Sequence, residues 1–118
     1  MVIKKLPGLM IGWLMVISVW FLSLMPLSVP VDTLQGGDKL GHLLAYFVMT
    51  YWFLHLADNK KLVLVLFIAM GFVIELLQGL TGYRFFEWAD LLANMAGVLM
   101  ALIIFSVFKW RLKKLFYN

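Results

Sequence analysis

Four long apolar stretches dominate this chain and restrict what it can fold into. They cover residues 6–25, 40–57, 62–80 and 88–108, and only short connections separate them. Each stretch is close to the roughly 20 residues that an α-helix needs to cross a bilayer. The composition agrees, because 64% of the 118 residues are hydrophobic, against about 45–50% in soluble domains. We therefore predict an all-α fold, an integral membrane bundle of four transmembrane helices, as a single domain over residues 1–118.

The basic residues predict the orientation of this bundle. Eight of the 10 lie before the first stretch, between the second and third, or after the fourth; they are Lys4, Lys5, Lys60, Lys61, Lys109, Arg111, Lys113 and Lys114. In a chain with four spans these positions share one side of the membrane, and only Lys39 and Arg84 fall on the other. The positive-inside rule then puts both termini in the cytoplasm. The first stretch is too long for a signal-peptide core and lacks a small-residue cleavage site, so we expect an uncleaved span.

Composition also argues against several kinds of site and partner. The chain has no cysteine, so disulfides, thiol nucleophiles and cysteine-based metal sites are excluded. Its net charge of +4 follows from the cytoplasmic loops, and the basic patches with interleaved aromatic residues that bind nucleic acid are missing. We expect no nucleic-acid partner and no cofactor.

Most of the ionisable and amide side chains within the apolar stretches lie toward the predicted outer side. On the second stretch Asp38, His42 and Tyr46 recur every four residues, which places them on one face of a helix. Glu75 and Gln78 lie near the end of the third stretch, and Asp90 and Asn94 near the start of the fourth. Polar groups at membrane depth are costly and usually have partners or a function. The predicted topology brings all of these residues to one level of the membrane.

Simpler explanations exist for some of these residues. Asp38 and Asp90 could cap helices, and Asn94 could hold two helices together. His42 and Glu75 are harder to explain, because each lies inside its span and needs a partner there. We predict that Glu75, His42 and Arg84 lie within hydrogen-bonding reach of one another. The full predicted ligand-binding set is Asp38, Lys39, His42, Tyr46, Glu75, Gln78, Arg84, Asp90 and Asn94.

The spacing of this set resembles the VanZ-like family of bacterial membrane proteins. The shared pattern is Asp38-Lys39-x-x-His42-x-x-x-Tyr46, Glu75-x-x-Gln78, Arg84 and Asp90-x-x-x-Asn94-x-x-Gly97, with Ser23-Leu-Met-Pro26 at the end of the first stretch. The resemblance implies a small multi-pass protein of the bacterial cytoplasmic (inner) membrane. The namesake of the family is associated with resistance to the lipoglycopeptide teicoplanin, but no chemical mechanism comes with the resemblance.

Three functions are compatible with the polar set. First, it binds an amphiphile from the outer leaflet, such as a lipid-linked cell-envelope precursor or a lipoglycopeptide, with Arg84 pairing to phosphate or carboxylate. Second, it is the site of an intramembrane enzyme that uses His42 and Glu75 as acid and base on a phosphorylated or acylated lipid. Third, it is a buried ion-pair network that fixes helix register. A metal held by Asp38, His42, Glu75 or Asp90 is not predicted, since no ligand pair has a known helical spacing. The sequence leaves the choice between binding and turnover, and the oligomeric state, open.

Overall fold

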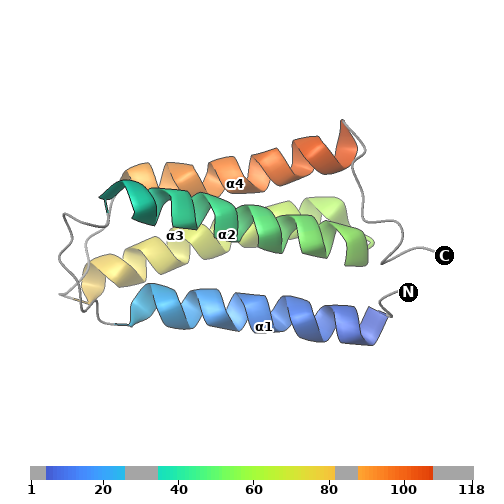
Figure 1. Ribbon diagram of the computed structural model, residues 1–118, viewed down its shortest axis with the longest axis horizontal. Coiled ribbons are helices and arrows are strands. Elements are labelled where there is room, and N and C mark those ends of the chain that lie inside the picture. The colour runs from blue at the N-terminus through green and yellow to red at the C-terminus, as the bar shows by residue number, and fades with distance from the viewer. Residues whose placement is uncertain (1–4, 26–34, 82–87, 108–118) are drawn as a thin grey trace.

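A computed structural model of the chain describes residues 5–25, 35–81 and 88–107, except for the side chains of residues 5 and 35–38. The described part contains four helices and no strand: α1 (Lys5–Leu24), α2 (Gln35–Leu56), α3 (Lys60–Leu80) and α4 (Trp88–Ser106). The helices run alternately up and down (Figure 1). Consequently α1 and α3 end where α2 and α4 begin, and we call this the polar end of the bundle.

Three of the helices, α1, α3 and α4, are long and apolar enough to cross a membrane. The exposed surface agrees with this, because α1 leaves large apolar side chains such as Leu6, Leu14 and Phe21 more than half exposed. The predicted bounds of these three helices agree with the structure to within about two residues. The expected all-α architecture is confirmed over the described residues.

The start of α2 differs from the sequence prediction. The sequence predicted a span over residues 40–57 with Asp38 as a possible cap, but α2 already begins at Gln35. Asp38 therefore lies within the first turn of the helix and does not precede it. Hydropathy marks the apolar part of a helix, whereas the helical backbone of α2 continues beyond that part through a polar, glycine-containing segment.

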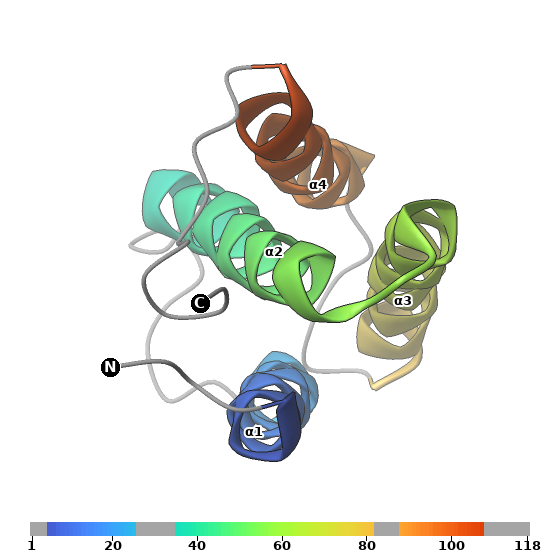
Figure 2. The same cartoon turned by 90° about the vertical axis from the view of Figure 1, so that its right-hand side faces the viewer.

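The second helix is the centre of the bundle. It contacts each of the other three helices, most extensively α4, and the end-on view shows it between α1 and α4 (Figure 2). Met49 and Leu54 of α2 pack into the apolar core with Phe67 of α3 and Val98 of α4. The position of α2 explains why its polar face lies inside the bundle.

Glycine residues set two of these contacts. A Cβ atom on Gly97 of α4 would overlap the backbone carbonyl of Leu43 in α2, so the two helices touch through their backbones there. On the other side of α2, a Cβ on Gly12 of α1 would come within 2.7 Å of the Phe53 ring. Nearby, the Trp52 indole donates a 2.8 Å hydrogen bond to the carbonyl of Gly8. Small residues thus allow close approach of helices, as is common in membranes.

A tight connection fixes α3 against α2 at the end opposite the polar end. Asn59 caps α3, because its Oδ1 accepts a 3.1 Å hydrogen bond from the backbone N–H of Leu62. The Lys60 ammonium donates to the carbonyl of Ala57 and lies 5.5 Å from the centre of the Phe105 ring. This short turn forces α2 and α3 to be antiparallel neighbours.

Candidate functional site

Buried polar side chains gather in the half of the bundle nearest the polar end. They come from α2, α3 and α4, and their exposed fractions are at most 9%: His42, Tyr46, Glu75, Gln78, Asp90 and Asn94. Glu75, predicted to lie inside its span and to need a partner there, is fully buried inside the bundle at 0% exposure. Such groups are normally hydrogen-bonded or complete a functional site.

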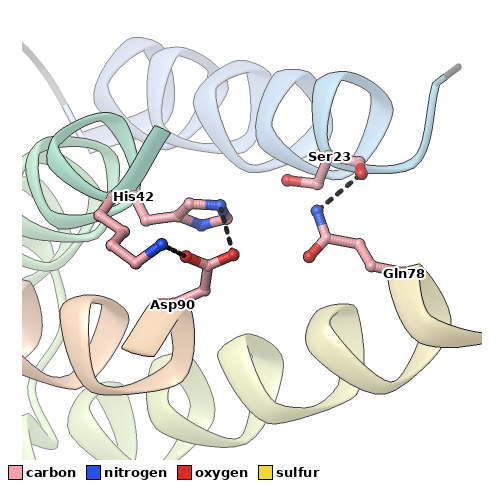
Figure 3. Close-up of polar contacts among 5 residues, drawn as sticks. Ser23, His42, Gln78 and Asp90 are labelled. Atoms are coloured by element: carbon pink, nitrogen blue, oxygen red, sulfur yellow. Dashed lines mark hydrogen bonds and ion pairs between the residues drawn. The ribbon is translucent and has the colours of Figure 1, made fainter. Parts of the chain in front are cut away.

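Three of these side chains form a compact cluster. His42, Glu75 and Asp90 each offer one nitrogen or oxygen atom, and these atoms all lie within 4.8 Å of one another. The His42 Nε2 is 4.0 Å from Asp90 Oδ2, and Figure 3 shows the two side chains facing each other from α2 and α4. The helix order therefore brings together residues that the sequence separates by up to 48 positions. His42 and Glu75 thus belong to one cluster, whereas hydrogen bonding among Glu75, His42 and Arg84 stays a prediction.

Lys39 closes the cluster on the side of the polar end. Its Nζ lies 3.4 Å from Asp90 Oδ1, and its side chain is 32% exposed. Asp90 is in the first turn of α4, where the helix dipole also favours a negative charge. The carboxylate is thus held by a cation on one side and faces the imidazole on the other.

A second polar layer lies one helical turn deeper. Tyr46 follows His42 by four residues, Asn94 follows Asp90 by four, and Gly71 precedes Glu75 by four. Asn94 Nδ2 and Tyr46 Cε2 lie 3.2 and 3.3 Å from the point that a Cβ on Gly71 would occupy. Side chains on a helix lean toward its N-terminus, so Tyr46 and Asn94 lean toward the cluster while Glu75 of the antiparallel α3 leans toward them.

Several atoms of this deeper layer have no protein partner among the described residues. The Tyr46 hydroxyl and both polar atoms of Asn94 are buried without a hydrogen bond there, as is the Thr50 hydroxyl one turn further along α2. Leaving a buried polar group unsatisfied typically costs about 1–3 kcal/mol. A network selected only for stability would be expected to satisfy these groups, so the layer has capacity to bind water, an ion or a ligand.

Gln78 makes a different contact at the same end of the bundle. Its Nε2 donates a 2.8 Å hydrogen bond to the backbone carbonyl of Ser23, which joins α3 to the last turn of α1 (Figure 3). The backbone of Gln78 also takes part in the C-terminal cap of α3. Its carbonyl accepts hydrogen bonds from the Thr81 hydroxyl at 2.7 Å and from the Thr81 amide at 3.3 Å. Sequence reasoning did not identify the Ser23 carbonyl as the partner, since any residue can supply a backbone oxygen.

Two members of the predicted site cannot be placed. Arg84 and the side chain of Asp38 lie outside the described residues, so the predicted pairing of Arg84 with Glu75 stays a prediction. Gly71 is not among the predicted site residues, but it leaves the space that Tyr46 and Asn94 approach. The signal for this role is its position one turn from Glu75.

The second histidine is separate from the cluster, as expected from its position thirteen residues along the same helix. His55 lies near the opposite end of α2, where its Nδ1 is 2.8 Å from the carbonyl of Tyr51. Its ring packs edge-on against Tyr51 and Phe105. This environment explains the burial of His55 by packing alone, which makes it a suitable control for His42.

Of three comparisons with known proteins, one found a match, and it agrees with the family resemblance of the sequence pattern. Searches among curated proteins and among solved structures returned no match. A family model described as VanZ/LLP1 matches residues 8–109, a range that covers α1 from Gly8 onward, the other three helices and every residue of the cluster. The chain therefore belongs to the VanZ/LLP1 family.

Proposed function

We propose that this chain spans the bacterial cytoplasmic membrane four times, with both termini in the cytoplasm. Three helices are apolar enough to cross a membrane, and α2 has 22 residues, which suffices in length. The lower hydropathy of α2 follows from its inward-facing polar stripe, which the other helices cover. The distribution of basic residues supports the orientation, and it puts the polar end in the outer leaflet.

Within this topology, we propose that the polar end binds the headgroup of an amphiphile, such as a lipid-linked molecule of the cell envelope. The observation that carries this proposal is the buried layer of Tyr46 and Asn94, whose polar atoms have no hydrogen-bond partner among the described residues. A headgroup, or the water that accompanies it, would supply those partners. Lys39, which is partly exposed beside Asp90, can meet an anionic headgroup as it enters.

An intramembrane enzyme is the second candidate. It is favoured by one observation: the nitrogen or oxygen atoms of His42, Glu75 and Asp90 lie within 4.8 Å of one another, so imidazole and carboxylate could share a proton as acid and base. The two candidates differ in what happens to the amphiphile after binding. Recovery of a chemically altered lipid from a reaction with the purified protein would favour the enzyme.

Binding measurements with matched variants test the headgroup site. The full chain in lipid nanodiscs is titrated with a lipid-linked cell-wall precursor, and with a neutral diacylglycerol as the control lipid. We expect His42→Asn and Asp90→Asn to melt close to wild type but to bind the precursor at least about tenfold more weakly, as is usual when a buried polar ligand contact is lost. His55→Asn and Asp58→Asn should bind like wild type, because both residues lie at the opposite end of the bundle.

Two results would contradict the proposal. If His42→Asn and Asp90→Asn both melt far below wild type, the cluster is a structural ion-pair network, since breaking a buried pair typically costs about 3–5 kcal/mol. If all variants bind the precursor equally, the headgroup does not lie at the polar end.

A further inference from the structure

We infer that His42, Glu75 and Asp90 form a binding site for a divalent transition-metal ion such as Zn²⁺ or Mn²⁺. The ion would lie beneath the proposed headgroup, so the inference rests on the proposed function for where the site is. Binding of the ion needs no amphiphile, however, so the two can be tested separately.

The arrangement of the three side chains suits an ion. Zinc binds histidine nitrogen and carboxylate oxygen at about 2.0–2.2 Å, which puts neighbouring ligand atoms roughly 3–4 Å apart. The three candidate atoms lie within 4.8 Å of one another, and His42 Nε2 is 4.0 Å from Asp90 Oδ2. Glu75 has a long side chain, and small rotations of its torsions would bring its carboxylate into range. The three ligands come from three helices that the core holds in place.

The types of ligand narrow the choice of ion. Imidazole favours zinc and other transition metals, whereas carboxylates also accept manganese and magnesium. Three protein ligands leave at least one coordination position for water or a ligand, as in catalytic zinc sites. A divalent ion would also bring two positive charges to two carboxylates that are 0% and 4% exposed, and attraction between charges is strong in a medium of low dielectric constant.

The deeper polar layer is the independent observation that points to a bound species. Asn94 is 1% exposed, and neither its Oδ1 nor its Nδ2 has a hydrogen-bond partner among the described residues. It shares a helix face with Asp90, and it leans toward the cluster because α4 begins at the polar end. The Tyr46 hydroxyl also has no hydrogen-bond partner among these residues. Tyr46 lies one turn below His42 on α2, and its side chain leans toward the cluster as well. Asn94 Oδ1 can be a fourth ligand, or both residues can hold water bound to the ion, as outer-shell residues do in metal sites.

An ion would also resolve an electrostatic conflict in the proposed headgroup site. Two buried carboxylates repel the phosphate of a lipid-linked precursor, and Lys39 is already within 3.4 Å of one of them. A divalent ion on the same carboxylates becomes the largest local charge and reverses the preference of the site. It would then attract a phosphate oxygen to its open coordination position.

Metal binding is measured with the full chain in detergent, after treatment with EDTA and dialysis. Zn²⁺ or Mn²⁺ alone should raise the melting temperature of wild type, and Co²⁺ should give visible absorption bands from the ligated ion. We expect Glu75→Gln and His42→Asn to weaken metal binding by at least about tenfold, because even loss of an outer-shell partner costs that much. The controls His55→Asn and Asp58→Asn should bind the metal like wild type.

Several outcomes would overturn the metal site. A wild-type melting temperature that neither metal changes, together with no Co²⁺ bands, would do so. So would an equal response in wild type, His42→Asn and Glu75→Gln, which would mean adventitious binding elsewhere. If Glu75→Gln does not fold, His42→Asn decides the matter. If the precursor still binds in EDTA and no metal changes the protein, the metal site is wrong and the headgroup site stands. If a metal binds but the precursor does not, the headgroup site is wrong and the metal site stands.

Discussion

Gly97 in α4 lies directly against the backbone carbonyl of Leu43 in α2, and the space for even one methyl group is missing. A Cβ on Gly97 would also come within 3.0 Å of the backbone nitrogen of Phe47. Backbone atoms cannot rotate away as a side chain can, so the helices themselves would have to separate. This contact lies about one turn below Asn94 and sets the distance between the two helices that carry His42 and Asp90.

We therefore expect Gly97→Ala to lower stability by about 1–3 kcal/mol or more, the usual cost of overpacking. The matched control is Gly41→Ala, because Gly41 lies on α2, the helix that Gly97 contacts, and a Cβ there meets nothing within 4 Å. Gly41→Ala should melt at or slightly above the wild-type temperature, since alanine is the better helix former. Melting curves in detergent compare the two variants. Equal melting temperatures would contradict the close backbone contact between α2 and α4.

Removing the side-chain amide of Gln78 should loosen α1. We expect Gln78→Leu to cost about 0.5–1.5 kcal/mol, because it deletes the hydrogen bond that joins α3 to α1. Ser23→Ala is the control: the acceptor is the Ser23 carbonyl oxygen and not its hydroxyl, so this variant should be as stable as wild type. A larger loss from Ser23→Ala than from Gln78→Leu, measured by thermal unfolding, would show that the hydroxyl carries the contact.

Tyr46→Phe should separate a functional layer from a structural one. The Tyr46 hydroxyl is buried without a hydrogen-bond partner among the described residues, so its removal relieves a desolvation cost and breaks no protein contact. We expect the variant to melt at or above the wild-type temperature and to bind the headgroup or metal more weakly. Thr50→Val should be equally stable for the same reason. Marked destabilisation of Tyr46→Phe would mean that the hydroxyl has a protein partner.

Single cysteines test the proposed topology without interference, because the natural chain has none. A membrane-impermeant maleimide added to intact cells should label the variants Thr33→Cys and Tyr83→Cys. Cysteines at Lys61 and Asn118 should react only after the membrane is permeabilised, since the basic residues put them in the cytoplasm. Labelling of Asn118→Cys in intact cells would reverse the orientation and move the polar end to the cytoplasmic leaflet.

The helices and their inward faces could be predicted from the amino-acid sequence alone. Hydrophobic length predicted the bounds of α1, α3 and α4, and the four-residue recurrence of Asp38, His42 and Tyr46 predicted one polar stripe on α2. His42 and Tyr46 are at most 9% exposed in the structure. Periodicity suffices for such predictions because a regular helix fixes the direction of every side chain relative to its neighbours on the same helix.

The way in which the polar stripes of different helices meet could not be predicted from the sequence. The depth of one helix relative to the next depends on where backbones can touch, which Gly97 and Leu43 set for α2 and α4. A change in this depth by one turn would pair His42 with Asn94 instead of Asp90. The acceptor of Gln78 is a backbone oxygen that carries no sequence signature. Contacts of this kind arise from the distances between helices, and periodicity within a single helix contains no information about them.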